Sequence, residues 1–563
     1  MTGGVTVRTW RGHLFQLAFL GCSAVLLLAA LSMPSPLLGQ TPAPARKVAG
    51  PLFRTSDRCI ACHNGLTTLS GQDVSFGFNW RPSMMANSGR DPYWQAGVRR
   101  ETIEHPESRA AIEDECSICH MPMARFEAKT AGREGQVFAH LPFNPDKDED
   151  RLAADGVSCS LCHQITRDKL GTRESFVGGF VVDTMTPKTG RPEYGPYEID
   201  AGHARIMRSS SGGFQPTESE HIRTSEVCGT CHTLYTKALG PQGKIVGELP
   251  EQMPYQEWLH SGFRNSQSCQ SCHMPVIEEA VPVTPVFGSP REGVSQHTFV
   301  GGNFFMQRLL NRFRADLSVA ALPQELEPAA SRTIDFLKTS AAAISIDSVE
   351  LQADRLEAVI KVQDLSGHKF PTAYPARRVW LHVTVRDRNN RVIFESGALD
   401  SSGLIRGNDN DADASRYEPH HREITSPDDV QIYEAIMVDS SGALTTGLLN
   451  AVRYVKDNRL LPRGFDKGTA GQDVAVEGDA AQDPDFSGGG DLVRYLVATG
   501  NAQGPLQVEA ELWYQLISYR WAQNLHPFDA FEPRRFTGYY ETMSPSSGLM
   551  LVRATASTQD AHR

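Results

Sequence analysis

The chain has little positive charge and few long apolar runs. Its 563 residues carry a net charge of −11, and only 21% of them are charged. A bulk charge of this sign excludes a protein that binds nucleic acid through a basic surface, and the charge is too dilute for a disordered acidic chain. After the first forty residues no segment is apolar enough to predict a membrane span. Hydrophobic residues make up 40% of the sequence, which is enough for sizeable cores.

Cysteine is nearly absent outside one repeated pattern. Ten of the eleven cysteines lie in five copies of Cys-x-x-Cys-His, and the eleventh is Cys22. The ten are Cys59, Cys62, Cys116, Cys119, Cys159, Cys162, Cys228, Cys231, Cys269 and Cys272. A disulfide framework would not place a histidine after every second cysteine. Zinc sites built from paired motifs would leave one motif over, and a thioredoxin-like redox motif occurs once in a domain.

The repeated pattern is instead the attachment signature of c-type haem. Two cysteines three residues apart bind the haem through thioethers, and the adjacent histidine is the proximal ligand of the iron. The sequence therefore predicts five covalently bound haems. The proximal ligands are expected to be His63, His120, His163, His232 and His273.

The first forty residues predict export. Arg8 and Arg11 precede an apolar run from about Leu14 to Leu31, and prolines then end the run, as in a secretory signal peptide. Export agrees with the oxidising compartment that haem attachment requires. We expect the periplasm, with a membrane-anchored or cell-surface position as the alternatives. The pattern leaves two alternatives to a cleaved signal peptide. The segment could stay as an uncleaved anchor, which would be the chain's one membrane contact, or Cys22 could be lipidated.

The rest of the chain divides into three parts. Residues 50–300 hold all five motifs, and their frequent Gly, Pro and Ser predict short helices and irregular loops around the haems. Residues 301–342 predict two bridging helices, the second opened by Glu327-Pro328 because proline suits a first helical turn. From residue 343 to 563 apolar residues alternate in short runs, which predicts an antiparallel β-sandwich. The expected fold class is α+β.

A weak internal duplication suggests ligands for the distal faces of the irons. In both halves of the motif region a histidine lies shortly before a Cys-x-x-Cys-His-Met-Pro sequence, and another lies 20 or 24 residues after the motif histidine. The distal candidates, in the order in which we rank them, are His297, His140, His260, His203, His368, His105 and His221. Each has a structural alternative, since a histidine can cap a helix, lie in solvent or stabilise a turn by hydrogen bonds.

The sequence resembles the exported multihaem c-type cytochromes. The resemblance rests on the five motifs, Gly156-Val-Ser-Cys-Ser-Leu-Cys-His163, the two Cys-His-Met-Pro sequences, His297-Thr-Phe and Gly367-His-Lys-Phe-Pro-Thr372. It covers residues 50 to about 385. Pentahaem nitrite reductases carry a Cys-x-x-Cys-Lys motif whose lysine ligates the catalytic haem. This chain has no such motif, and the departure argues against nitrite reduction.

The leading interpretation is an electron carrier, not an enzyme. Mostly bis-histidine haems packed in one small region would pass electrons to a redox protein or exchange them with a quinol-linked partner, and the β-domain would supply docking, self-association or filament contacts. The alternative is an oxidoreductase with one open-coordination haem that acts on a small nitrogen or sulfur compound. Calcium at Asp409-Asn-Asp411-Ala-Asp413 is a minor possibility, because the segment lacks the glycine and late glutamate of an EF-hand loop.

Overall fold

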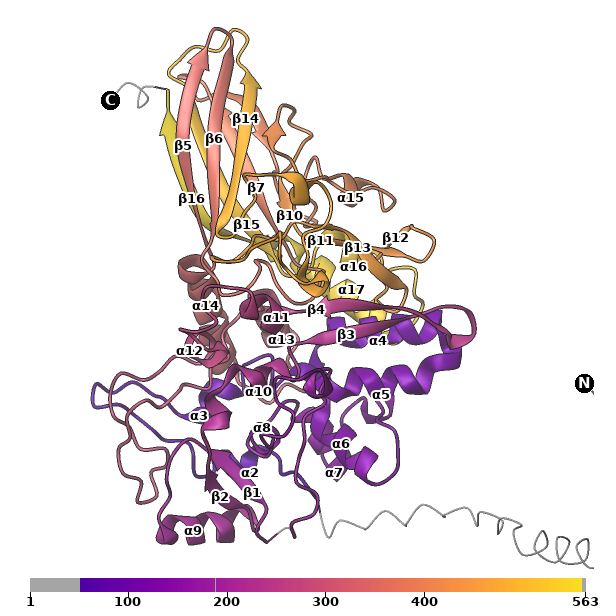
Figure 1. Ribbon diagram of the computed structural model, residues 1–563, viewed down its shortest axis with the longest axis vertical. Coiled ribbons are helices and arrows are strands. Elements are labelled where there is room, and N and C mark those ends of the chain that lie inside the picture. The colour runs from indigo at the N-terminus through magenta and orange to yellow at the C-terminus, as the bar shows by residue number, and fades with distance from the viewer. Residues whose placement is uncertain (1–50, 188, 559–563) are drawn as a thin grey trace, which may run out of the picture. The chain divides into compact units, whose positions relative to one another are not determined.

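The computed structural model describes residues 51–187 and 189–558 (Figure 1). Val48–Arg563 forms one compact unit. The signal segment and Cys22 lie outside the described residues. Among the described residues, no helix combines the length and the apolar character that a membrane span requires. The division into a haem domain and a β-domain stays a prediction.

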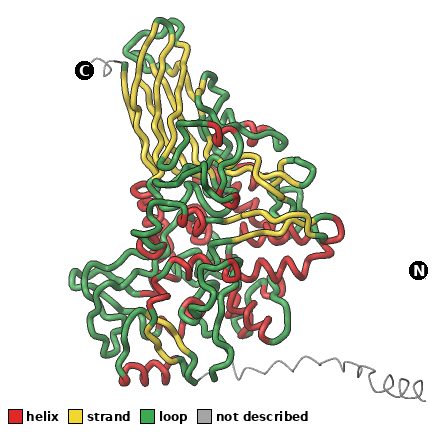
Figure 2. Tube along the Cα trace, in the orientation of Figure 1, coloured by secondary structure: helices red, strands yellow, loops and turns green. Residues whose placement is uncertain are grey.

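The first half of the described chain is mainly short helices and long loops (Figure 2). Its helices are α2 (Asp57–Ile60), α3 (Phe76–Trp80), α4 (Pro92–Glu104), α5 (Arg109–His120), α6 (Pro122–Thr130), α7 (Asp148–Ala154), α8 (Cys159–Cys162), α9 (Ala201–Ser211), α10 (Ser225–Gly229), α11 (Pro254–Leu259), α12 (Cys269–His273), α13 (Phe304–Arg312) and α14 (Pro323–Ser340). Four strands were not expected here: β1 (Pro192–Gly195) pairs with β2 (Gln215–Glu218), and β3 (Leu234–Leu239) pairs with β4 (Ile245–Gln252).

The two expected bridging helices are present as α13 and α14. The second begins earlier than predicted, because Pro323 takes the first helical position and Pro328 lies inside the helix. The carboxylate of Glu325 accepts the backbone N–H of Leu322 at 2.8 Å, which supplies the N-terminal cap. The prediction that a proline opens the second helix is therefore correct, but the proline is Pro323 and not Pro328.

The second half of the chain is β-rich, which confirms the α+β class. Its elements are β5 (Ala342–Gln352), β6 (Arg355–Asp364), β7 (Arg378–Arg386), β8 (Val392–Ser396), α15 (Asp409–Ala412), β9 (Glu423–Ile424), β10 (Ile432–Tyr433), β11 (Ala435–Asp439), β12 (Leu444–Thr445), β13 (Ala451–Asp457), β14 (Gly490–Ala498), β15 (Gln507–Gln515), α16 (Tyr519–Gln523), α17 (Phe531–Met543) and β16 (Gly548–Ser557). One sheet has the order β5-β6-β14-β9, and a second has the order β10-β7-β15-β16, with β8 added beside β7. A third has the order β12-β11-β13.

Alternation of apolar residues builds the main core. On β6, Leu356, Ala358, Ile360 and Val362 are fully buried, while the residues between them are partly exposed. These side chains belong to one hydrophobic cluster with residues of β7 and β15 and with the apolar face of α13. The core of the β-rich half therefore continues into the helical half without a break.

A buried ion pair joins the start of β7 to α15. Arg378 donates to both carboxylate oxygens of Asp411 at 2.8 Å, and both side chains are at most 2% exposed. The Asp411 carboxylate also accepts the N–H of Ile405. Asp411 therefore already has a cationic partner in the segment that the sequence suggested for calcium.

We expect Asp411→Asn to lower the free energy of unfolding by about 3–5 kcal/mol, because it leaves the Arg378 charge buried without a partner. Chemical denaturation of the haem-loaded protein, followed by far-ultraviolet circular dichroism, measures the change. The matched control is Asp409→Asn, whose partner Arg416 is exposed, and which should cost about 1 kcal/mol or less. Equal losses in the two variants would contradict the expectation.

Candidate functional site

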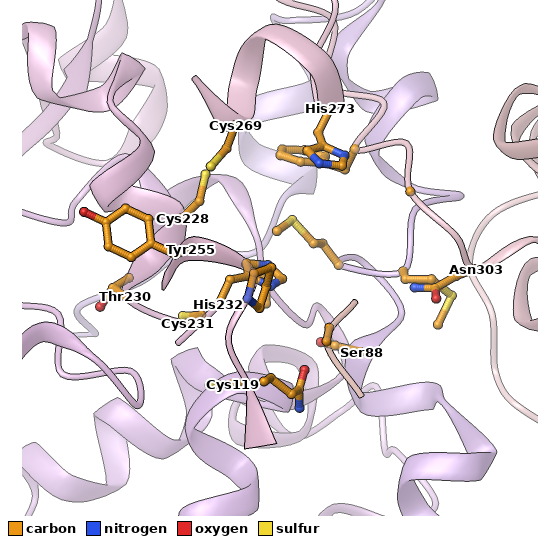
Figure 3. A pocket seen from close by; sticks show the side chains of 18 of the residues that line it. Ser88, Cys119, Cys228, Thr230, Cys231, His232, Tyr255, Cys269, His273 and Asn303 are labelled. Atoms are coloured by element: carbon orange, nitrogen blue, oxygen red, sulfur yellow. The ribbon is translucent and has the colours of Figure 1, made fainter. Parts of the chain in front are cut away.

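A large internal cavity lies where all five motifs meet. Its volume is about 1750 Å³, and all five motif histidines and nine of the ten motif cysteines line it. Figure 3 shows His232, His273, Cys228 and Cys269 around this space. Small-ligand sites usually measure about 300–1,000 Å³, and protein interiors contain few voids larger than a water molecule. A void of this size, lined by cysteine and histidine, fits several large cofactors.

Short helical turns place each motif. Residues i, i+3 and i+4 of a helix lie on one side, so Cys159, Cys162 and His163 at α8 are directed to a common side, and the other motifs begin or end similar turns. All ten motif cysteines are free thiols. Burial raises the pKa of Cys162 to about 12, so this thiol is uncharged at neutral pH. The chain thus presents thiols and histidines in the arrangement that covalent haem attachment uses.

Thiols of different motifs touch one another. Cys59 contacts Cys159, Cys119 contacts Cys231, and Cys228 contacts Cys269 through side-chain hydrogen bonds. Cys162 also lies near Cys228 and Cys231. The first motif is therefore beside the third, the third is near the fourth, and the fourth touches both the second and the fifth.

Four of the five motif histidines are held by the same hydrogen bond. The Nδ1 atoms of His63, His120, His163 and His273 lie 2.7, 3.0, 2.5 and 2.6 Å from backbone carbonyl oxygens. A carbonyl at Nδ1 fixes the proton there and leaves Nε2 free to bind a metal. Burial lowers the pKa of His120, His232 and His273 to about 4, which keeps these rings neutral. His232 has no ring hydrogen bond to the described residues.

Two of the distal candidates lie opposite motif histidines. The ring centres of His163 and His297 are 6.3 Å apart with an angle of 13° between the rings, and those of His273 and His368 are 6.1 Å apart at 8°. Two imidazoles that share one metal at about 2 Å from each nitrogen have ring centres about 6 Å apart. The two pairs therefore have the spacing of two axial ligands on one iron.

The other five candidates do not line the cavity: His140, His260, His203, His105 and His221. Both ring nitrogens of His221 already have partners, the Ser219 hydroxyl and the Ile165 carbonyl. Both ring nitrogens of His203 are likewise engaged, by Asp200 and the Phe287 carbonyl. The Nδ1 atom of His140 lies 2.7 Å from a carboxylate oxygen of Asp150. The structure does not bring these residues to the motif histidines.

Two arginines line the cavity with unused donors. The Nε atoms of Arg332 and Arg377 are buried without a hydrogen-bond partner among the described residues. Arg377 is held by the Thr372 carbonyl and the Asn303 side chain. Unused guanidinium donors in an apolar cavity suit carboxylate groups of a cofactor. The neighbouring Arg378 is not available for this role, because it is paired with Asp411.

The sequence did not identify two further residues at the site. The Trp94 ring stacks on His120 with ring centres 4.3 Å apart at 3°, so it restrains the rotation of that imidazole. Glu257, which is fully buried beside the cavity, had no signal.

Two clusters of histidine and acidic side chains lie among the described residues, and neither suits a metal ion. The first is Glu101, Glu104 and His105, where Arg100 already supplies a cation to Glu104. The second is His420, Asp483 and Asp491. There the amides of Gln431 and Asn458 both donate to Nδ1 of His420, so its proton lies on Nε2 and points to Asp483.

Comparisons with known proteins show a likeness of fold. No protein-family description and no curated protein sequence matches the chain. Among solved structures, a penta-heme cytochrome c552 from Thermochromatium tepidum matches with a TM-score of 0.50 and 15% sequence identity. The match covers 90% of this chain and 100% of that one. The fold is therefore similar to that of a multihaem cytochrome over nearly its whole length.

Proposed function

We propose that this chain is an exported multihaem c-type cytochrome that transfers electrons through five covalently bound haems. The observation that carries the proposal is the single cavity on which five Cys-x-x-Cys-His motifs converge. The penta-heme neighbour supports the haem number, and the need for an oxidising compartment supports export. When bound, haem c supplies a one-electron iron couple.

The chain's own residues would hold these groups in a defined way. The motif histidines would bind the irons, with His297 paired to His163 and His368 paired to His273. Two histidines on each of these irons would leave no position for a substrate, which suits electron transfer. Arg332 and Arg377 would neutralise cofactor carboxylates.

The contacts among the motif thiols support a branched order of redox sites. The first motif leads through the third to the fourth, and the fourth adjoins both the second and the fifth. The fourth motif, with His232, is then the junction. A redox protein or a quinol-linked donor is the expected partner, and it would exchange electrons with the outer motifs.

A second candidate function rests on the histidines that are missing from the cavity wall. Among the described residues that line the cavity, His63, His120 and His232 have no second histidine opposite them. An iron with one open face can bind a small nitrogen or sulfur compound. An oxidoreductase therefore stays the alternative to a pure electron carrier.

We expect the mature protein to contain five haems, at least two of them low-spin and closed to added ligands. Whole-protein mass spectrometry counts the haems, and low-temperature electron paramagnetic resonance counts the spin states. Four or fewer haems in fully matured protein would overturn the main proposal. Cyanide binding to one or more haems in the native protein would favour the oxidoreductase.

A further inference from the structure

The turn that carries His368 is fastened to the helix before the fifth motif. It connects β6 and β7, and its backbone forms a two-way bridge between Phe370 and Leu460, with both N–H···O distances at 2.9 Å. The turn also forms hydrogen bonds with Glu257 of α11, which lies twelve residues before Cys269. The turn that carries His368 is thus connected directly to the segment that leads to His273.

Glu257 bonds to the turn at two positions directly after His368. Its Oε2 atom accepts the backbone N–H of Lys369 at 3.2 Å and the hydroxyl of Thr372. Its Oε1 atom lies 2.8 Å from Nη1 of Arg459. The side chain is fully buried, so its charge is balanced by these contacts and not by water.

Three more charges complete a buried network. The ammonium of Lys369 donates to Asp457 at 2.7 Å and to the Ala475 carbonyl at 2.9 Å. Arg459 donates twice to Asp457, each time at 2.8 Å. Burial alone would raise the pKa of Asp457, but Arg459 and Lys369 hold it well below its usual range. Two acids and two bases therefore balance in a volume that excludes water.

Stability alone does not explain such a network. Apolar residues of similar volume are often as stabilising as a buried ion pair, because removing charges from water is costly. What the charges add is direction: Glu257 has contacts with Lys369 and Thr372, which lie one and four residues after His368. Because metal ligands are oriented by the groups around them, these contacts restrict where the His368 ring can lie.

We propose that Glu257, Lys369, Asp457 and Arg459 form a positioning network that holds His368 opposite His273 and so controls the ligation and the potential of the haem at the fifth motif. This inference rests on the proposed function. The four residues act through His368 and do not touch the iron themselves. The network also places a negative charge near this ligand, since Glu257 acts electrostatically on His368.

The test is Glu257→Gln in the haem-loaded full-length protein. Glutamine keeps the size of the side chain but removes the charge, which leaves the network with an excess cation. We expect the haem at the fifth motif to bind cyanide at least tenfold faster than in the wild type. Its redox equilibrium should shift about tenfold toward the reduced form, or about 59 mV for a one-electron couple, because a negative charge stabilises the oxidised iron. Optical redox titration and cyanide binding measure the two effects.

Two further variants separate positioning from general loss of stability. Glu434→Gln neutralises another buried ion pair of the β-rich half, with Lys456, and should leave both readouts unchanged. Glu257→Asp keeps the charge and should lie closer to the wild type than Glu257→Gln in both. The inference is overturned if Glu257→Gln changes neither readout, or if Glu434→Gln changes both equally. Should removal of His368 itself leave this haem closed, the ligation in the proposed function is wrong instead.

Discussion

A chain made without haem is expected to be unfolded. Cavities left by single large-to-small core substitutions already cost about 3–5 kcal/mol, while a folded protein is stable by only about 5–15 kcal/mol, and the space here measures about 1750 Å³. We therefore expect the fold to depend on cofactors that fill this space. Protein produced without haem attachment, examined by circular dichroism and hydrogen exchange, should lack the secondary structure and the protection of the haem-loaded protein.

Limited proteolysis of the haem-free chain adds a second result. If the β-rich segment folds independently, a resistant fragment should begin near residue 343. If the β-rich segment needs the apolar core that it shares with α13 in order to fold, the resistant fragment should begin near residue 304 or be absent. A fully protected haem-free chain would contradict the expectation, because it would mean that the cavity can collapse or remain empty at little cost.

His368→Ala is expected to open one haem of the mature protein. The ring of His368 is the only group that we assign to the distal face opposite His273, and alanine cannot reach the iron. One haem should become high-spin, and the protein should bind one more equivalent of cyanide than the wild type. Electron paramagnetic resonance and a cyanide titration measure this change.

His260→Ala is the matched control for that experiment. His260 was also a candidate from its position near the fifth motif, but it is exposed, and its Nδ1 atom lies 2.8 Å from the Gln256 carbonyl. Its removal should change neither the spin count nor cyanide uptake. If both variants behave like the wild type, the assignment of His368 as a ligand is wrong. If His260→Ala opens a haem, the position of a histidine relative to the cavity does not decide which histidines bind iron.

The motifs could be predicted from the sequence because their chemistry is local. Two cysteines and a histidine within five residues can be recognised whatever the rest of the chain does, so all five copies are visible in the sequence, and the structure brings them together at one cavity. The strands of the β-rich half were also visible, since Leu356, Ala358, Ile360 and Val362 alternate with polar residues. The strands β1 to β4 were missed because they are short and lie among glycines and prolines.

The distal positions are harder to predict because they depend on the whole fold. His297 and His140 occupied equivalent places in the duplication, yet only His297 lies opposite a motif histidine, and that histidine belongs to the third motif. His368 reaches His273 from 95 residues further along the chain. Spacing along the sequence does not encode such pairs. The role of Glu257 could not be predicted for the same reason, since its partners lie more than 100 residues away in the sequence.

If the chain is exported as we propose, the cavity wall has a consequence for the order of events during export. It is closed by segments from opposite ends of the chain, including Cys59, Trp94, His368, Leu448 and Trp521. Contacts between residues so far apart form slowly, and they form last when the C-terminal segment is delivered last. During that interval the motif thiols would remain open to haem attachment. The late arrival of the β-rich half would thus give each proposed haem time to be joined before the wall closes over it.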